Sequence, residues 1–276
     1  MIMRAIFANA VHTVTRDALP HLQELFAHAN DTPYDLVAVA EEKCFEDGVS
    51  GAPVVTVYGD FLGASVTCGQ YLRLLAVHRE YRNRGIGTEL VRDAYARGAR
   101  VVGAEGGNYF TPGVPMALSG FFERFGRKTA ETQNLICSLD LNGGQALLPV
   151  PVPRAEGQAR VPVLHFIQRE FGAIWHFEAQ KAQALHYVEH DGEIAGFAAH
   201  SANNRPLGFF GPTGVARHLR GRGYGARLLL ASLADMHTRG YEKAIIPWTD
   251  ALDFYRKTCG AVVHERFATF LIDSAP

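Results

Sequence analysis

The sequence has no excess of charge of one sign and no long apolar run. Its 276 residues contain 27 lysines and arginines against 28 aspartates and glutamates, a formal net charge of −1. A nucleic-acid groove or a polybasic membrane surface needs a sustained positive excess, which disfavours both. Residues 1–30 lack the uninterrupted apolar core of a secretion signal, and no segment approaches the ~20 apolar residues of a membrane-spanning helix. We therefore expect a cytoplasmic protein with no nucleic-acid and no membrane partner.

Paired cysteines and paired metal ligands are also missing. Cys44, Cys68, Cys137 and Cys259 are far apart in the sequence and form no C-x-x-C pair, so we expect buried free thiols. His186 and His190 have a spacing that binds metal on a helix. However, Asp191-Gly192 directly after them is typical of a hairpin turn, which predicts a strand with a solvated face. The sequence thus predicts no metal site.

The sequence does contain an internal repeat. Val77–Gly87 aligns without gaps on Val215–Gly225, and the two copies are offset by half the length of the chain. Repeats of this length indicate two copies of one domain. The flexible Asn142-Gly143-Gly144 segment predicts the boundary between them, with domains at 1–142 and 145–276. Pro149–Pro153 is either a linker or the first edge strand of the second copy, and equal repeat lengths favour the strand.

The same order of predicted elements surrounds the repeated segment in each half. A hairpin precedes it, an apolar strand leads into it, and an amphipathic helix follows and ends at a glycine. The predicted elements are a first helix (17–29 and 162–171), a hairpin (54–67 and 185–200), the apolar strand (71–77 and 207–215) and a short β run after the second helix (100–104 and 243–248).

An Arg-x-x-Gly-x-Gly loop joins the strand to the helix in both copies. The backbone N–H groups at a helix start have no partner within the helix and carry the positive end of its dipole, which suits an anion such as a pyrophosphate. The glycines let phosphate oxygens approach the main chain, and the arginines add charge-assisted contacts. The candidate anion-binding residues are Arg82, Asn83, Arg84, Gly85, Ile86 and Gly87 in the first copy, and Arg220, Gly221, Arg222, Gly223, Tyr224, Gly225 and Ala226 in the second.

These loops, with Phe254-Tyr255-Arg256-Lys257 before Gly260-Ala261, resemble the GNAT superfamily of acyl-CoA-dependent N-acyltransferases, in its tandem two-domain form. The resemblance implies an α+β fold with two tandem domains, each a mixed, mostly antiparallel sheet flanked by helices. It implies that the fourth and fifth strands splay apart around the pantetheine arm of acetyl-CoA, with the pyrophosphate on the loop. It also implies that main-chain groups at the end of the fourth strand, Val77 in the first copy and Val215 in the second, bind the cofactor. It also places Tyr255 where the family often keeps the general acid that protonates the leaving thiolate.

The two copies differ in the residues that carry the chemistry. Phe122 stands where the second copy has Tyr255, so the first copy has no phenol proton to give. The first copy also has a turn-rich insertion, residues 106–115, that forms a substrate wall or caps the gap between the strands. We therefore expect catalysis in the second copy and a weaker or silent first copy.

The sequence does not single out a general base or an acceptor pocket. The candidate bases in the second copy are Glu178, Glu189, Glu193, Asp250 and Asp253. The aromatic candidates for an acceptor pocket are Phe171, Trp175, Phe177, Phe209 and Trp248.

The expected activity is transfer of an acetyl group from acetyl-CoA to the amine of a small molecule, by direct attack in a ternary complex. Two alternatives stay open. One is a catalytically silent protein that binds CoA only for stability or as a scaffold. The other is a peptide or protein N-acetyltransferase, which needs an open groove for a chain.

Overall fold

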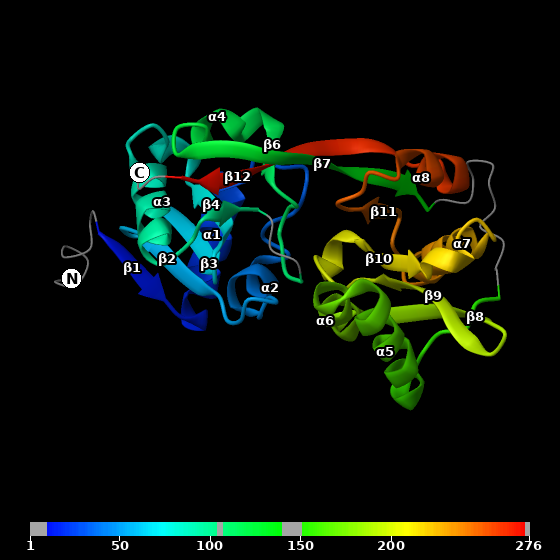
Figure 1. Ribbon diagram of the computed structural model, residues 1–276. Helices are drawn as coiled ribbons and strands as arrows, with labels where there is room; N and C mark the ends of the chain where they lie inside the picture. Colours follow the sequence, from blue (N-terminus) through cyan, green and yellow to red (C-terminus); the bar gives the residue numbers. More distant parts are fainter. Residues whose placement is uncertain (1–9, 104–106, 140–150, 274–276) are drawn as a thin grey trace. The chain divides into compact units, whose positions relative to one another are not determined.

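The chain folds into two units whose limits do not follow the middle of the sequence. The computed structural model (Figure 1) describes residues 10–103, 107–139 and 151–273. Unit 1 comprises residues 1–132 together with 266–276, and unit 2 comprises residues 133–265. The predicted boundary at residues 142–144 lies outside the described residues, and a division there stays a prediction. The two compact units meet between residues 132 and 133, and the segment from residue 266 onward belongs to unit 1.

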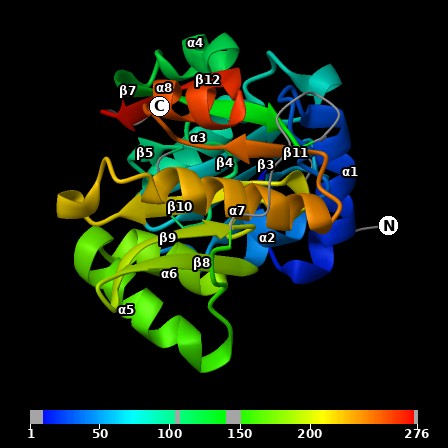
Figure 2. The same cartoon turned by 90° about the vertical axis from the view of Figure 1, so that its right-hand side faces the viewer.

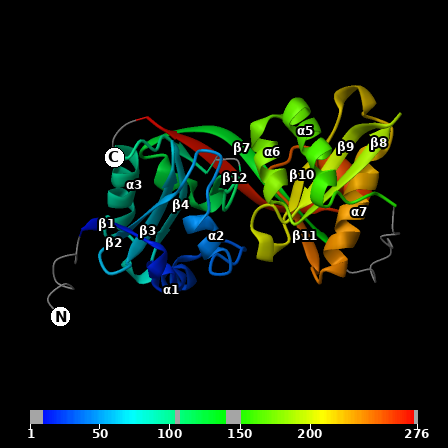
Figure 3. The same cartoon turned by 90° about the horizontal axis from the view of Figure 1, so that it is seen from below.

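Unit 1 is a mixed sheet covered by helices on both faces. Its strands follow the order β1-β2-β3-β4-β5-β12-β7, antiparallel from β1 to β4 and parallel between β4 and β5. Helix α3 covers one face of β2–β4, and α1 and α2 lie on the other (Figure 3). The elements are β1 (Val11–Val14), α1 (Leu19–Ala29), α2 (Ala40–Phe45), β2 (Val54–Tyr58), β3 (Gly63–Cys68), β4 (Tyr71–Val77), α3 (Ile86–Ala96), β5 (Val101–Val102), β6 (Val114–Pro115), α4 (Ser119–Phe122), the first half of β7 (Gly126–Ser138) and the end of β12 (Val262–Ile272).

Unit 2 repeats this plan. Strands β8, β9 and β10 are antiparallel, with α7 on one face and α5 and α6 on the other (Figure 2). Phe209, directly before β10, forms one parallel bridge with Ile245 of β11, and β11 pairs with the second half of β7. The elements are α5 (Arg160–Phe171), α6 (Ala173–Lys181), β8 (Ala184–His190), β9 (Glu193–His200), β10 (Phe210–Val215), α7 (Tyr224–Thr238), β11 (Lys243–Ile246) and α8 (Leu252–Cys259).

The last strand of each sequence copy ends in the sheet of the other copy. Strand β7 starts in unit 1, and its residues Leu135–Ser138 pair with β11 of unit 2. Strand β12 starts in unit 2, and its end pairs with β5 and β6 of unit 1 through Phe267↔Pro115 and Phe270↔Val102. Phe267 and Phe270 are almost fully buried there. The core of unit 1 is therefore completed by the C-terminal end of the chain.

Most predicted elements are confirmed, and the differences have local causes. Strand β5 stops at Val102 because Gly103 turns the chain with φ +77°, and β11 stops before Pro247, which has no N–H to donate. Strand β10 begins only at Phe210, since residues 205–207 form a short 3₁₀ turn. An edge strand was predicted at Pro149–Pro153, and its described part, residues 151–153, forms no strand. Its end nevertheless lies beside β8, because Tyr187 N–H of β8 donates to Pro153 O at 3.1 Å. Among the described residues, no helix is long and apolar enough to cross a membrane.

Candidate functional site

Strands β4 and β5 of unit 1 separate after two residue pairs. They are in register only at Tyr71↔Val101 and Leu72↔Val102, followed by one hydrogen bond from Gly103 N–H to Leu72 O at 3.2 Å. Strand β4 continues to Val77. Its edge on that side therefore offers main-chain donors and acceptors to a gap, as predicted from the family resemblance.

A cavity of about 630 Å³ lies along this gap, wholly within unit 1. Its floor is β4 from Leu72 to Val77, and one end is the loop before α3. The insertion contributes Phe110, Thr111 and Val114, so it forms a wall of the cavity. Further lining comes from the turn after α1 (Ala29, Asn30, Asp31, Thr32) and from α4 (Gly120, Phe121, Phe122).

The two repeated loops have the same backbone conformation. Asn83 and Gly85 have φ of +59° and +84°, and the equivalent Gly221 and Gly223 have +80° and +82°. Gly85 and Gly223 are the N-cap residues of α3 and α7. Left-handed residues directly before a helix turn successive N–H groups toward one point, which forms a site for an anion. The loop geometry therefore fits a pyrophosphate in both units.

The first arginine of each loop is directed at its own strand. Arg82 donates from Nε to Val77 O at 3.2 Å and from Nη2 to Ala29 O at 2.7 Å, and it pairs with Asp31. Arg220 makes the equivalent Nε bond to Val215 O at 3.2 Å. These bonds fix the loop against the end of the strand. Phosphate contact by these two arginines stays a prediction.

The second arginines and the neighbouring loop residues also have protein partners. Arg84 Nη2 donates to Glu80 O at 3.2 Å, and Arg222 Nη1 lies 3.5 Å from His190 Nε2. Tyr224 Oη is 2.9 Å from Nδ1 of the same histidine. Arg84 and Arg222 are both exposed, so their side chains can reorient toward an anion.

The second glycine of each loop contacts an aromatic ring from the last helix of its copy. A Cβ on Gly87 would meet Phe121 at 3.1 Å, and one on Gly225 would meet Phe254 at 3.5 Å. This equivalence aligns Phe122 with Tyr255, as the sequence alignment assumes. Phe122 lines the unit 1 cavity.

Tyr255 is a buried residue of unit 2. It packs edge-to-face on Phe254 and Phe210, with ring centroids 4.9 and 6.4 Å apart. Burial, with a smaller contribution from Cys259, raises the pKa of the Tyr255 phenol well above its usual value. The phenol therefore keeps its proton at neutral pH, which a general acid requires. Its role in proton transfer stays a prediction.

The gap between the diverging strands β10 and β11 of unit 2 has a different lining. Strand β10 also diverges after a single bridge, but Phe171 and Trp175 stack on each other and pack onto Gly214 of β10. A Cβ on Gly214 would lie 2.5 Å from the Phe171 ring, whereas unit 1 has Ala76 at the equivalent position. Two of the predicted acceptor-pocket aromatics therefore cover the inner face of β10.

The candidate bases differ in exposure. Glu178 is buried and accepts a hydrogen bond from Asn203 Nδ2 at 3.1 Å. Glu189, Glu193, Asp250 and Asp253 are on exposed residues. Of the other aromatic residues predicted for the acceptor pocket, Phe209 is buried beside β11 and Trp248 is 44% exposed. None of these positions singles out a base.

Comparisons with known proteins agree with the geometry. Residues 33–126 match the acetyltransferase (GNAT) domain, and residues 156–261 match the acetyltransferase (GNAT) family. The chain therefore contains two GNAT domains in tandem, the first in unit 1 and the second in unit 2. No match was found among curated proteins.

Solved structures share the tandem fold. The GCN5-related glucosamine N-acetyltransferase region of a fungal multi-domain GH3 β-N-acetylglucosaminidase superposes with a TM-score of 0.75 at 18% identity. That match covers 95% of this chain but only 38% of the other. A tandem GNAT protein from the clavulanic acid biosynthesis pathway has a TM-score of 0.66 at 16% identity, over 95% and 97% of the two chains. A GCN5-related N-acetyltransferase from Sphaerobacter thermophilus gives 0.64 at 16% identity, over 95% and 94%.

Proposed function

We propose that this protein transfers an acetyl group from acetyl-CoA to the primary amine of a small molecule, with acetyl-CoA bound in the cavity of unit 1. The observation that carries the proposal is the continuity of that cavity. It joins the anion-binding loop before α3, the unpaired edge of β4 and the wall formed by the insertion. Phosphate, amide and acyl groups of one extended ligand each find a matching surface along it.

Acetyl-CoA supplies an activated thioester. The loop N–H groups at Gly85–Gly87 bind its pyrophosphate, and the free main-chain groups of β4 between Leu74 and Val77 orient the pantetheine arm and the carbonyl. The insertion and α4 limit the access of water. An amine with a pKa of about 10.4 is neutral in roughly one molecule in a thousand near neutral pH, at a cost of about 4 kcal/mol, so the acceptor must lose a proton before it attacks.

The cavity lining contains several polar residues. Asp31 lies at the loop end, where it pairs with Arg82, and Thr111 of the insertion and Arg73 of β4 also line the cavity. Such a lining suits an acceptor that carries hydroxyl groups as well as an amine. Amino sugars are therefore the first acceptor class to test, in agreement with the activity described for the fungal region.

The direct test is release of free thiol from acetyl-CoA across a panel of amines: glucosamine, an aminoglycoside, a polyamine, free amino acids and a peptide with a free N-terminus. We expect turnover with the polyhydroxylated small amines and little with the peptide. Turnover with the peptide alone would favour the peptide N-acetyltransferase alternative. Calorimetric binding of acetyl-CoA without any turnover would favour the silent binding protein. Absence of both binding and turnover would refute the proposal.

Catalysis in unit 2 is the second candidate, favoured by the protonated phenol of Tyr255. Tyr255→Phe removes only the hydroxyl and separates the two cases. If unit 1 is the catalytic one, we expect kcat to stay within about threefold of the wild-type value. If Tyr255 is the general acid, kcat falls by roughly 10²–10⁴ while KM for acetyl-CoA is unchanged. Steady-state thiol release at saturating acceptor measures the difference.

A further inference from the structure

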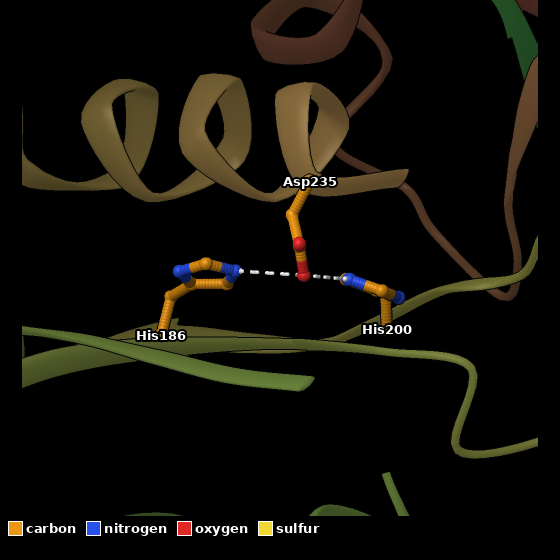
Figure 4. A group of neighbouring side chains, drawn as sticks. All are labelled: His186, His200 and Asp235. Atoms are coloured by element: carbon orange, nitrogen blue, oxygen red, sulfur yellow. Dashed lines mark hydrogen bonds and ion pairs between the residues drawn. The ribbon is translucent and has the colours of Figure 1, made fainter. Parts of the chain in front are cut away.

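Three ligand-type side chains meet inside unit 2. His186 comes from β8, His200 from the end of β9, and Asp235 from the last turn of α7 (Figure 4). In the β8–β9 register His186 faces Ala198 and His200 faces Ala184, so the two histidines are diagonal neighbours on one face of the sheet. Helix α7 covers that face and brings Asp235 between the two rings.

The distances between these donors are close to those of a metal-ligand set. Asp235 Oδ2 is 2.8 Å from His200 Nε2 and 3.5 Å from His186 Nε2, and all three donor atoms lie within 4.8 Å of one another. Ligands of a tetrahedral zinc ion at about 2.0–2.1 Å are separated from each other by about 3.3 Å. Reaching that spacing would require both the Asp235 carboxylate and the two imidazole rings to turn about the ion.

His186 provides the independent sign that a partner is missing. Its side chain is more than nine-tenths buried, and neither ring nitrogen makes a hydrogen bond of normal geometry. The polar groups near the ring are Asp235 Oδ2, 3.5 Å from Nε2, and the backbone of Val152. Long contacts of this kind recover little of the hydrogen bonding that a buried imidazole loses from water. An ion bound to Nε2 accounts for its position. The sequence predicted a solvated strand face here, and this part of that prediction is wrong, because α7 covers the face.

The orientation of the second histidine also suits a metal. His200 Nδ1 lies 3.1 Å from Ser201 Oγ, which fixes the ring with Nε2 toward Asp235.

Two arginines compete with a cation at this place. Arg239 Nε is 3.2 Å from Asp235 Oδ2, and Arg154 Nη1 is 3.8 Å from Oδ1. Burial works to raise the pKa of Asp235, but the hydrogen bond from His200 and the arginine charge outweigh it and hold the pKa below its usual value. Both arginine side chains are about one-third exposed, so each can turn to solvent when a cation replaces it at the carboxylate.

We propose that His186, His200 and Asp235 bind one divalent transition-metal ion of the zinc class, with water at the remaining position. Imidazole nitrogen and carboxylate oxygen are the donors that zinc and cobalt accept in tetrahedral sites. The ion would connect α7, which carries the second loop at its start, to β8 and β9. This site does not depend on where acetyl-CoA is bound, and its failure would leave the proposed acetyl transfer untouched.

Metal content is the test. The full-length protein is stripped with a chelator, incubated with one equivalent of Zn²⁺, desalted, and analysed by atomic emission. We expect about one zinc per chain for the wild type, and at least a tenfold weaker affinity for His186→Gln, His200→Gln and Asp235→Asn. His165→Gln, at an exposed position of α5, is the matched control and should retain zinc.

Cobalt adds a readout that a structural role cannot mimic. Co²⁺ in a tetrahedral site gives strong visible absorption, and His186→Cys, which replaces an imidazole by a thiolate ligand, should keep the ion and add a sulfur-to-cobalt charge-transfer band. Circular dichroism of each variant checks that it folds. The proposal is overturned if the folded wild type binds no zinc after desalting, or if His186→Gln binds as much as the wild type.

Discussion

Gly85→Val is expected to weaken acetyl-CoA binding at least tenfold and to remove most of the turnover. Gly85 has φ +84°, a conformation that a β-branched residue adopts only at a cost of about 1–2 kcal/mol. A Cβ there meets no atom within 4 Å, so the effect comes from the backbone and not from a clash. Relaxation of the loop would turn the N–H groups of Gly85–Gly87 away from the pyrophosphate. Calorimetry with acetyl-CoA and the thiol-release assay measure both effects.

Gly223→Val is the matched control. Gly223 has φ +82°, caps α7 as Gly85 caps α3, and likewise leaves an added Cβ without contacts. The two substitutions therefore impose the same strain on equivalent loops. We expect the Gly223 variant to keep most of the turnover. Loss of turnover in that variant alone would place catalysis in unit 2, as the sequence by itself predicts, and would contradict the assignment to unit 1.

Phe270→Ala is expected to destabilise unit 1 by about 3–5 kcal/mol, the usual cost of removing a buried phenylalanine ring. Phe270 is 1% exposed, pairs with Val102 of β5 and packs 5.9 Å from the ring of Phe122, which lines the cavity. This loss is a large part of the stability of a typical domain. A shift of the unit 1 transition in denaturant unfolding, together with weaker acetyl-CoA binding, would be the observed result.

Val263→Ala, on the same strand, is the control for that experiment. Its side chain is 37% exposed, and we expect a change of about 0.5 kcal/mol or less. Because a two-unit protein need not unfold in one step, the transitions are followed separately by tryptophan fluorescence, which reports only on unit 2, and by acetyl-CoA binding. Equal behaviour of the two variants would show that Phe270 is not part of the unit 1 core.

Local signals in the sequence account for most of the fold. Glycine-containing turns and alternating apolar residues predicted both hairpins, and the repeated Arg-x-x-Gly-x-Gly loops predicted two strand-to-helix junctions with left-handed residues. The sheet that β12 joins could not be predicted in this way. Its apolar residues, among them Phe267 and Phe270, indicate burial, but a strand pattern does not say which of two similar sheets it joins.

The same distinction between local and long-range signals applies to the residues of the two candidate sites. The loop residues lie together in the sequence, so their chemistry could be read from it. Phe110 and Thr111 were predicted only as part of an insertion, and their place in the cavity wall depends on the pairing of β6 with β12. His200 and Asp235 were missed because no spacing links them to His186. Only the register of β8 with β9 and the packing of α7 bring the three together.

The crossing of β12 has a consequence for synthesis of the chain. A ribosome delivers residues from the N-terminus, so nearly all of unit 1 emerges before the strand that fills the place beside β5. Until then the strands of that sheet have an open position and an incomplete apolar core, a state prone to aggregation and to pairing with the wrong strand. Completion of unit 1 therefore waits until residues 266–272 have left the exit tunnel, long after the rest of that unit has been made.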